Sequence, residues 1–207
     1  MSVVDTLNRG LRRVPAGAAY GIGLLPLGWL VWRAISGDLG VDPVKTLEHR
    51  LGLLALQFLV AGLCVTPLRR WAGLNLIRYR RAIGLIAFLY AVLHLAVWVS
   101  LDLQFRWAEI GTDLTRRPYI VVGMAAFVLM VPLAVTSNDA SLRRMGAAGW
   151  RRLHQLVYAL VPLSALHFLM VVKAWPWEPI LYLLAALALV GLRLPWIRRR
   201  AAIGAAR

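Results

Sequence analysis

Three of the four histidines in this chain lie inside long apolar segments: His94, His154 and His167. Ionisable side chains are costly at hydrocarbon depth, so a histidine within a membrane span is by default a candidate functional residue. His154 and His167 are thirteen residues apart on one segment, which corresponds to about 20 Å along a helix. This spacing favours two stacked cofactors, one towards each face of a bilayer, and imidazole makes haem the first candidate. For any single histidine, a hydrogen bond to a neighbouring carbonyl is the alternative.

The composition is that of a polytopic membrane protein, with 60% hydrophobic residues and a mean hydropathy of +0.69. A net charge of +15 would suggest nucleic acid as a partner for a soluble chain. Here the arginines flank apolar runs, where basic residues set the orientation in the bilayer, so we exclude a nucleic-acid partner. The single cysteine, Cys64, lies within an apolar run and is interpreted as a packing residue.

Six apolar runs approach the roughly 20 residues that a transmembrane helix needs. They predict an all-α, six-transmembrane-helix bundle that forms one domain, and the short connections between the runs leave no room for a soluble domain. Because the number of spans is even, both termini are expected on the same side of the membrane. The predicted spans are residues 14–32, 51–67, 82–101, 119–136, 153–172 and 177–196.

The distribution of charge predicts which side that is. The N-terminal segment, the 68–81 and 137–152 connections and the tail from Arg193 hold 17 of the 24 basic residues and only two of the nine acidic ones. Cytoplasmic loops carry the excess of Lys and Arg, so both termini are predicted to be cytoplasmic.

In this topology the third and fifth spans both run outward, which places His94 and His167 at one depth near the outer face and His154 near the cytoplasmic face. Two imidazoles from facing helices at one level can occupy both axial positions of a haem iron. His94 and His167 are therefore the predicted iron ligands of an outer haem, and His154 is a candidate ligand of an inner one.

The inner site lacks a second histidine. The residue fourteen positions before His94, on nearly the same helix face, is Arg80. A guanidinium pairs well with a propionate, so Arg80 or its neighbour Arg81 could hold the edge of a cofactor, although an arginine that sets orientation is the alternative. His154 could bind an inner haem alone, share a cofactor or face a flavin. It lies about 140° from His167 around a straight helix, unless Pro162 re-aims one of them.

Two further polar residues lie in the second span or at its outer end. His49 could belong to a docking surface or a quinone pocket, but we interpret it as a solvated side chain. Gln57, at hydrocarbon depth, is predicted to form a hydrogen bond with a neighbouring helix.

Several stretches together resemble the MsrQ (formerly YedZ) family, within the wider ferric-reductase-like transmembrane group. The resemblance covers nearly the whole chain from the first connection to Lys173. The matching stretches are DPVKTLEH (42–49), TPLRR (66–70), RYRRAIGLIAFLYAVLH (78–94), TRRPYIVVG (115–123), PLAVTSN (132–138), WRRLHQLVYAL (150–160) and LHFLMVVK (166–173).

The resemblance implies a b-type cytochrome of the bacterial inner membrane that passes electrons to MsrP, a periplasmic molybdopterin-containing methionine-sulfoxide reductase that repairs oxidised envelope proteins. The family's haem-associated histidines correspond to His94, His154 and His167, with one or two haems. The family also implies FMN, for which the sequence offers no site, and an electron donor that is either the quinone pool or a cytosolic flavin reductase.

No catalytic residue for a final substrate is expected on this chain, since the redox chemistry on that substrate would belong to another protein. Two alternatives remain open: a self-contained transmembrane ferric or quinone reductase, and a non-redox transporter or scaffold. The short loops and the lack of acidic residues within the spans argue against a proton-coupled transporter.

Overall fold

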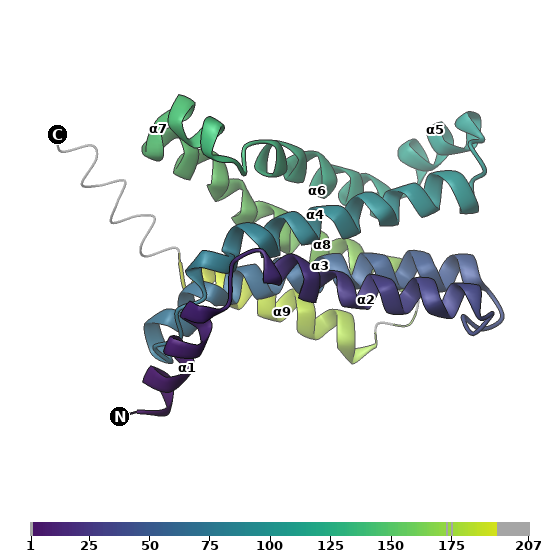
Figure 1. The fold of residues 1–207 in the computed structure, drawn as a ribbon. Helices are drawn as coiled ribbons and strands as arrows, with labels where there is room; N and C mark the ends of the chain where they lie inside the picture. Colours follow the sequence, from purple (N-terminus) through teal and green to yellow (C-terminus); the bar gives the residue numbers. More distant parts are fainter. Residues whose placement is uncertain (1, 173, 175, 194–207) are drawn as a thin grey trace.

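The computed structural model describes residues 2–172, 174 and 176–193, and the regular structure in these ranges is helical (Figure 1). In chain order the segments are α1 (Val3–Arg13), α2 (Ala18–Ile35), α3 (Pro43–Trp71), the 3₁₀ turn η1 (Ile77–Tyr79), α4 (Arg80–Val97), the π-helical turn η2 (Trp98–Asp102), α5 (Trp107–Arg116), α6 (Pro118–Val135), α7 (Asp139–Leu153), the 3₁₀ turn η3 (His154–Leu156), α8 (Val157–Val171) and α9 (Trp177–Gly191).

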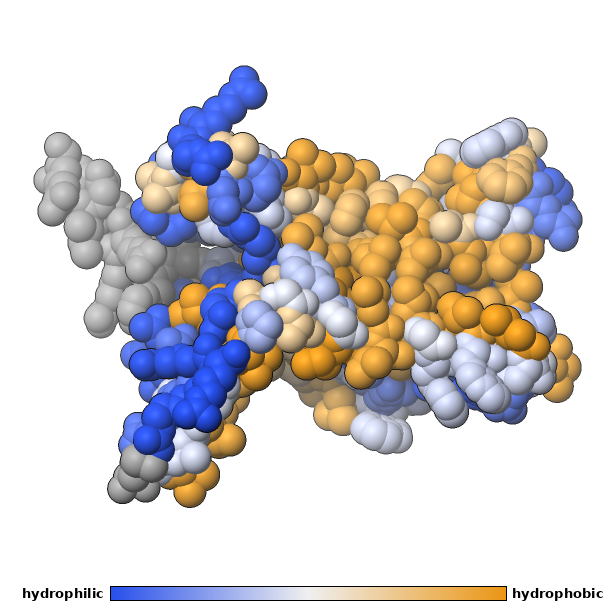
Figure 2. Space-filling view, viewed as in Figure 1, coloured by the Kyte–Doolittle hydropathy of each residue, from blue (hydrophilic) through white to orange (hydrophobic). Residues whose placement is uncertain are grey.

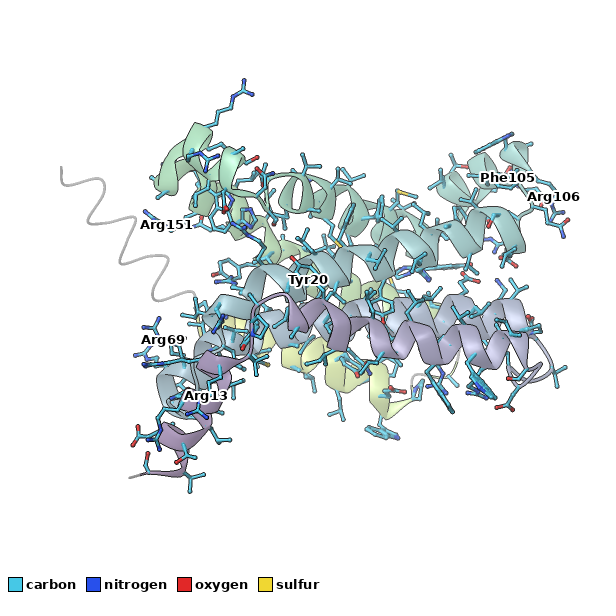
Figure 3. The ribbon with its side chains drawn as sticks, in the orientation of Figure 1. Arg13, Tyr20, Arg69, Phe105, Arg106 and Arg151 are labelled. Atoms are coloured by element: carbon cyan, nitrogen blue, oxygen red, sulfur yellow. The ribbon has the colours of Figure 1, made fainter. Side chains whose placement is uncertain are left out.

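The long helices form a bundle in which α3 packs against α4, α6 against α8, α8 against α9, and α2 against α4. Figure 1 places α1 and α7 at one end of this bundle and α5 at the other. We call the first the basic end, since it carries the arginines of α1, of residues 69–81 and of α7, together with Arg193. Figure 3 shows the labelled side chains of Arg13, Arg69 and Arg151 at this end. The end that carries α5 is the opposite end.

Five helical stretches are long and apolar enough to cross a membrane: Ala18–Ile35, Pro43–Trp71, Ile77–Asp102, Pro118–Val135 and Asp139–Val171. They correspond to the first five predicted spans, which confirms an all-α membrane fold. The sixth predicted span corresponds to α9, which is apolar but shorter. Its last predicted residues, 194–196, lie outside the described residues, so the sixth span stays a prediction.

The outer surface of the bundle is apolar. Leu25 and Trp29 on α2 are 69% and 62% exposed, and Leu184 on α9 is 57% exposed. Figure 2 shows a broad hydrophobic area across the middle of the visible face, with hydrophilic residues gathered mainly at the basic end. Side chains of this kind are stable facing outward only when the surrounding solvent is lipid.

Small residues let the helices approach each other closely, as is common in membrane bundles. Gly23 on α2 faces Ile86 on α4, and a Cβ at position 23 would collide with that side chain. Tyr90, fully buried on α4, donates a hydrogen bond to the Gly23 carbonyl at 2.8 Å. The contact fixes α2 against α4 and thereby the helix that carries His94.

The prediction for Gln57 is confirmed. Its amide on α3 donates to the hydroxyl of Tyr182 on α9 at 2.9 Å, so the hydrogen bond joins two neighbouring helices. Cys64 lies on the same helix and is partly buried, as expected of a packing residue.

Three helices lie in segments that the sequence predicted only as connections or flanking segments: α1, α5 and α7. α1 begins with a capping box, in which the Ser2 hydroxyl accepts from the Asp5 amide at 3.2 Å and the Asp5 carboxylate accepts from the Ser2 amide at 3.1 Å. Hydrogen bonds from Ser2 also lower the pKa of Asp5. α7 has an N-cap at Asn138, whose side chain accepts from the Ser141 amide at 2.8 Å.

Candidate functional site

The structure places the rings of His94 and His167 next to each other. His94 lies near the end of α4 and His167 near the end of α8, and their ring centres are 6.3 Å apart with planes inclined at 71°. Both side chains line one cavity of about 560 Å³, towards the opposite end of the bundle. Most of the other lining residues are apolar, as is typical of cofactor sites.

Each of these imidazoles is held by a backbone carbonyl. His94 Nδ1 lies 2.8 Å from the Glu48 carbonyl oxygen on α3, and His167 Nδ1 lies 2.7 Å from the Tyr119 carbonyl oxygen on α6. A carbonyl only accepts, so Nδ1 carries the proton and Nε2 keeps its lone pair. This is the usual arrangement of a metal-binding histidine, in which the second ring nitrogen fixes the tautomer and the orientation.

Two glycines make room for the rings. A Cβ at Gly123 on α6 would lie 2.7 Å from Cε1 and Nδ1 of His167, and a Cβ at Gly52 on α3 would lie 3.1 Å from the same atoms of His94. Real Cβ atoms do not approach other atoms as closely as 2.7 Å, so position 123 admits only glycine while His167 stays in place. The sequence analysis missed both residues, because glycine is common at helix contacts in membrane proteins and marks no particular one.

The spacing of the two rings fits one metal ion bound between them. A metal–imidazole bond is about 2.0 Å, so two imidazoles on opposite sides of one ion have their ring centres roughly 6 Å apart. Haem iron is a metal centre that two histidines commonly bind, so the pair would be able to hold a haem. The cavity volume is within the range of about 300–1,000 Å³ that is typical of cofactor sites.

Charged residues lie where the cavity meets the opposite end of the bundle. Lys45 is 3.0 Å from Glu48 and 2.7 Å from Asp102, and Arg117 is 2.9 Å from Asp113. The hydrogen bond from Arg117 to the Tyr119 hydroxyl, 3.1 Å long, raises the pKa of that guanidinium. Lys45 and Arg117 both line the cavity and could pair with carboxylates of a bound cofactor. The sequence analysis did not single out either of them.

His49 also lines this cavity, on α3 one turn before Gly52. Its side chain is exposed, and its ring centre is 5.6 Å from that of Phe168 on α8. The exposure agrees with a solvated side chain, but the position is inside the wall of the cavity and not on a distant surface.

His154 is held differently. Its Nε2 is 3.2 Å from the hydroxyl oxygen of Thr136, and its ring is stacked on Trp150 with centres 3.7 Å apart. The Thr136 hydroxyl already donates its only proton to the Pro132 carbonyl at 2.6 Å. The hydroxyl must therefore accept from His154, which places the ring proton on Nε2. In this arrangement Nδ1, and not Nε2, has the available lone pair.

The angle between His154 and His167 is set by local helix geometry. His154 begins the 3₁₀ turn η3, which precedes α8. Residues of a 3₁₀ helix turn by about 120° instead of about 100°, so three such steps reduce the predicted separation from about 140° to about 80°. Both histidines consequently contact α6, at Thr136 and at Tyr119. Pro162 lies inside the continuous helix α8.

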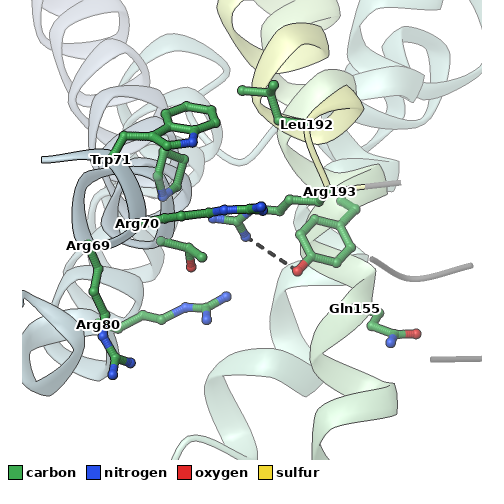
Figure 4. Close-up of a pocket in the computed structure, with 10 residues that line it drawn as sticks. Arg69, Arg70, Trp71, Arg80, Gln155, Leu192 and Arg193 are labelled. Atoms are coloured by element: carbon green, nitrogen blue, oxygen red, sulfur yellow. Dashed lines mark hydrogen bonds between the residues drawn. The ribbon is translucent and has the colours of Figure 1, made fainter. Parts of the chain in front are cut away.

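Arg80 lines a second cavity, of about 480 Å³, at the basic end (Figure 4). The described residues that line it include Arg69, Arg70, Arg193 and Tyr158, but not His154. His154 therefore does not line the cavity that Arg80 faces, although the two side chains are close enough to interact electrostatically.

Comparison with known proteins adds independent information. The family model described as "Ferric reductase like transmembrane component" matches residues 50–165, a segment that contains His94 and His154. Curated proteins from Brucella ovis, Brucella canis and Brucella suis are each 49% identical over 183 residues, which is 87% of this chain and 83% of each relative. Each is named "Protein-methionine-sulfoxide reductase heme-binding subunit MsrQ".

Proposed function

The chain belongs to the MsrQ family of haem-binding subunits of protein-methionine-sulfoxide reductases, within the ferric-reductase-like transmembrane group, and from this membership we propose that it is a b-type cytochrome that transfers electrons across a membrane. The observation that best supports the proposal is the pairing of His94 and His167, whose ring centres are 6.3 Å apart in a mainly apolar cavity. No other pair of histidine rings in the described residues is placed in this way.

The residues around the cavity hold and orient the two imidazoles. The carbonyls of Glu48 and Tyr119 fix the rings through Nδ1, and Gly52 and Gly123 leave the space that the rings occupy. Most of the lining residues are apolar, which lowers the local dielectric around the imidazoles. His94 and His167 would hold the haem between them, and the haem would supply a one-electron iron couple suited to electron transfer.

The proposed topology is that of six spans in the bacterial inner membrane, with the basic end and both termini in the cytoplasm. The arginines at this end support the orientation, since cytoplasmic loops carry the excess of basic residues. The His94–His167 pair then lies towards the periplasm, where electrons would pass to the catalytic subunit MsrP, a molybdopterin-containing methionine-sulfoxide reductase. Reduction of the sulfoxide belongs to that subunit, and the present chain contributes no catalytic residue to it.

On the cytoplasmic side we propose that electrons arrive from the quinone pool or from a cytosolic flavin reductase, with FMN as a second cofactor. His154 stays the candidate ligand of a second haem, so the chain would hold one haem or two. Arg80, which lines the cavity at the basic end, is the candidate partner for an anionic group, such as a propionate, of a cofactor bound on the cytoplasmic side.

The proposal is tested by the optical spectrum of the purified protein, oxidised and reduced, together with pyridine-hemochrome counting. Because His94 and His167 would supply both axial ligands, we expect His94→Ala and His167→Ala each to abolish the low-spin b-type signal of this site. His49→Ala is the matched control, since it removes an imidazole from the same cavity wall without touching the pair. A full low-spin spectrum in both of the first two variants would contradict the proposal.

A further inference from the structure

The cavity at the basic end has an unusual concentration of positive charge. Four of its lining residues are arginines, contributed by α3, by the start of α4 and by the segment after α9, and they are Arg69, Arg70, Arg80 and Arg193. No Asp or Glu is among the described residues that line it. Figure 4 shows the side chains of Arg70, Arg80 and Arg193 extending into the space between α3 and α4 on one side and α8 and α9 on the other.

The acidic residues of this end are engaged elsewhere. Asp5 accepts hydrogen bonds from Ser2 in the capping box of α1, and Asp139 forms an ion pair with Arg81. These are the only two acidic residues that the sequence assigns to the cytoplasmic side, and residues 194–207 contain no Asp or Glu. Neither of these two carboxylates is among the described residues that line the cavity.

Arg193 shows that part of this positive charge is buried and does not lie only on the surface. Arg193 is 8% exposed. Its guanidinium donates one hydrogen bond to the Leu63 carbonyl and another, 3.3 Å long, to the Tyr158 hydroxyl. Its Nε has no hydrogen-bond partner, the one buried side-chain nitrogen or oxygen in this state among the described residues. Orientation by the positive-inside rule requires basic residues near the ends of the spans, but it does not require burial of one of them. An unpaired buried donor on a cation is costly unless a ligand pairs with it.

We propose that this cavity binds the phosphate-monoester group of a ligand. A phosphate monoester carries about −1.5 to −2 charges at pH 7 and three strong acceptor oxygens, and guanidinium groups bind phosphate in a bidentate manner. The group can come from two sources at a membrane surface: a soluble phosphate monoester such as FMN, or a lipid with a monoester headgroup such as phosphatidate. The proposal rests on the proposed function for the choice of FMN as a probe and for the idea that Arg80 pairs with an anionic cofactor. The positive charge of the cavity is observed in the structure and does not depend on the proposed function.

The test for the soluble source uses the full-length protein in nanodiscs of phosphatidylcholine. FMN and riboflavin share one ring system and differ by the phosphate, so their affinities, measured by flavin fluorescence, isolate its contribution. We expect FMN to bind at least about tenfold more tightly than riboflavin. Arg80→Gln should remove most of this ratio, and the double variant R70Q/R80Q should remove all of it. Arg144→Gln, which deletes an exposed arginine of α7 outside the cavity, should leave the ratio unchanged.

The lipid source is tested with the same variants in nanodiscs that contain phosphatidate, by native mass spectrometry. Retention of phosphatidate by the wild type and by Arg144→Gln, but not by the double variant, would assign the cavity to the lipid. Equal affinity for FMN and riboflavin together with no selective retention of phosphatidate would overturn the proposal, as would binding that the double variant leaves intact.

The haem spectrum of each sample separates this proposal from the preceding one. It reports on His94 and His167 at the other end of the bundle, and it also shows that the variants are folded. A normal spectrum with no phosphate selectivity would refute the cavity proposal alone, whereas a missing spectrum with phosphate selectivity would refute the haem site alone.

Discussion

At the scale of single residues, the partner of one ring nitrogen decides what the other nitrogen can do. His94 and His167 use Nδ1 to donate to backbone carbonyls, so Nε2 keeps its lone pair. His154 uses Nε2 to donate to Thr136 and stacks on Trp150, so its ring is restrained by different contacts. The three histidines are alike in the sequence, but the structure separates them into a pair and a single residue.

The clearance around His167 gives a prediction about Gly123. In Gly123→Ala the new Cβ would lie 2.7 Å from the His167 ring, so the imidazole must move. We expect this movement to weaken the hydrogen bond from His167 Nδ1 to the Tyr119 carbonyl. We expect a loss of haem or an altered low-spin spectrum, together with a destabilisation of about 1–3 kcal/mol from overpacking. Optical and electron paramagnetic resonance spectra of the purified variant measure the change at the iron.

Two other glycines provide an internal scale for this experiment. Gly52→Ala should have a smaller effect, because its Cβ would lie 3.1 Å from His94, and Gly84→Ala should have almost none, because nothing lies within 4 Å of its Cβ. Equal spectra for the three variants would show that the glycines do not position the histidines.

The sequence was sufficient to predict that His94 and His167 share a level, because depth in a membrane follows from counting residues along spans of known direction. It was not sufficient for residues whose role depends on a contact between distant segments. Gly123 meets His167 across 44 positions, and Arg193 meets Leu63 across 130. No local sequence pattern predicts such a contact, so the sequence alone did not distinguish Gly123 or Arg193 from the other glycines and arginines.

At the scale of helices, polar contacts between spans determine which faces meet. The hydrogen bond from Gln57 to Tyr182 joins α3 to α9, and α9 is shorter than the five stretches that are long enough to cross a membrane. Three of its large side chains, Leu181, Leu184 and Leu187, are more than half exposed. The hydrogen bond therefore adds a directional contact to the apolar packing of Tyr182, Leu183 and Ala186 in the core of the bundle.

A double-mutant cycle measures this contribution. Gln57→Leu and Tyr182→Phe each remove one partner and keep a similar volume, so their coupling free energy reports the hydrogen bond itself. We expect a coupling of about 0.6 kcal/mol, with an upper limit of about 1.7 kcal/mol, as found for polar contacts between membrane helices. Reversible unfolding in bicelles gives the four stabilities. A coupling of zero would mean that apolar packing alone holds α9 against the bundle.

The spans were predicted well because the number of apolar residues that cross a bilayer is fixed by its thickness. The helices α1, α5 and α7 were not predicted, since they are shorter and mixed in polarity, and their stability depends on caps such as those of Ser2 and Asn138. The turn η3 could not be predicted either. A change from α-helical to 3₁₀ geometry over three residues has no reliable sequence signal, yet it alters the direction of His154 by about 60°.

At the scale of the whole molecule, the two ends of the bundle have different chemistry. The basic end holds the arginine cavity, and the histidine cavity lies towards the opposite end, where Lys45 is paired with Glu48 and Asp102. Positive charge is in excess at the basic end, whereas basic and acidic residues balance each other at the opposite end. A membrane protein with this asymmetry is inserted in one orientation, so each cavity faces one compartment.

This orientation predicts the labelling of single cysteines by a membrane-impermeant maleimide, in a background where Cys64→Ser removes the native thiol. Thr112→Cys, exposed on α5, should react in spheroplasts, and Arg144→Cys, exposed on α7, should react only after lysis. The even number of spans further predicts that Ala206→Cys behaves like Arg144→Cys. Labelling of Ala206→Cys in spheroplasts, with position 144 protected, would show that α9 ends on the other side and that the chain has five spans. Exchange of the patterns at positions 112 and 144 would reverse the orientation, and with it the proposed direction of electron transfer.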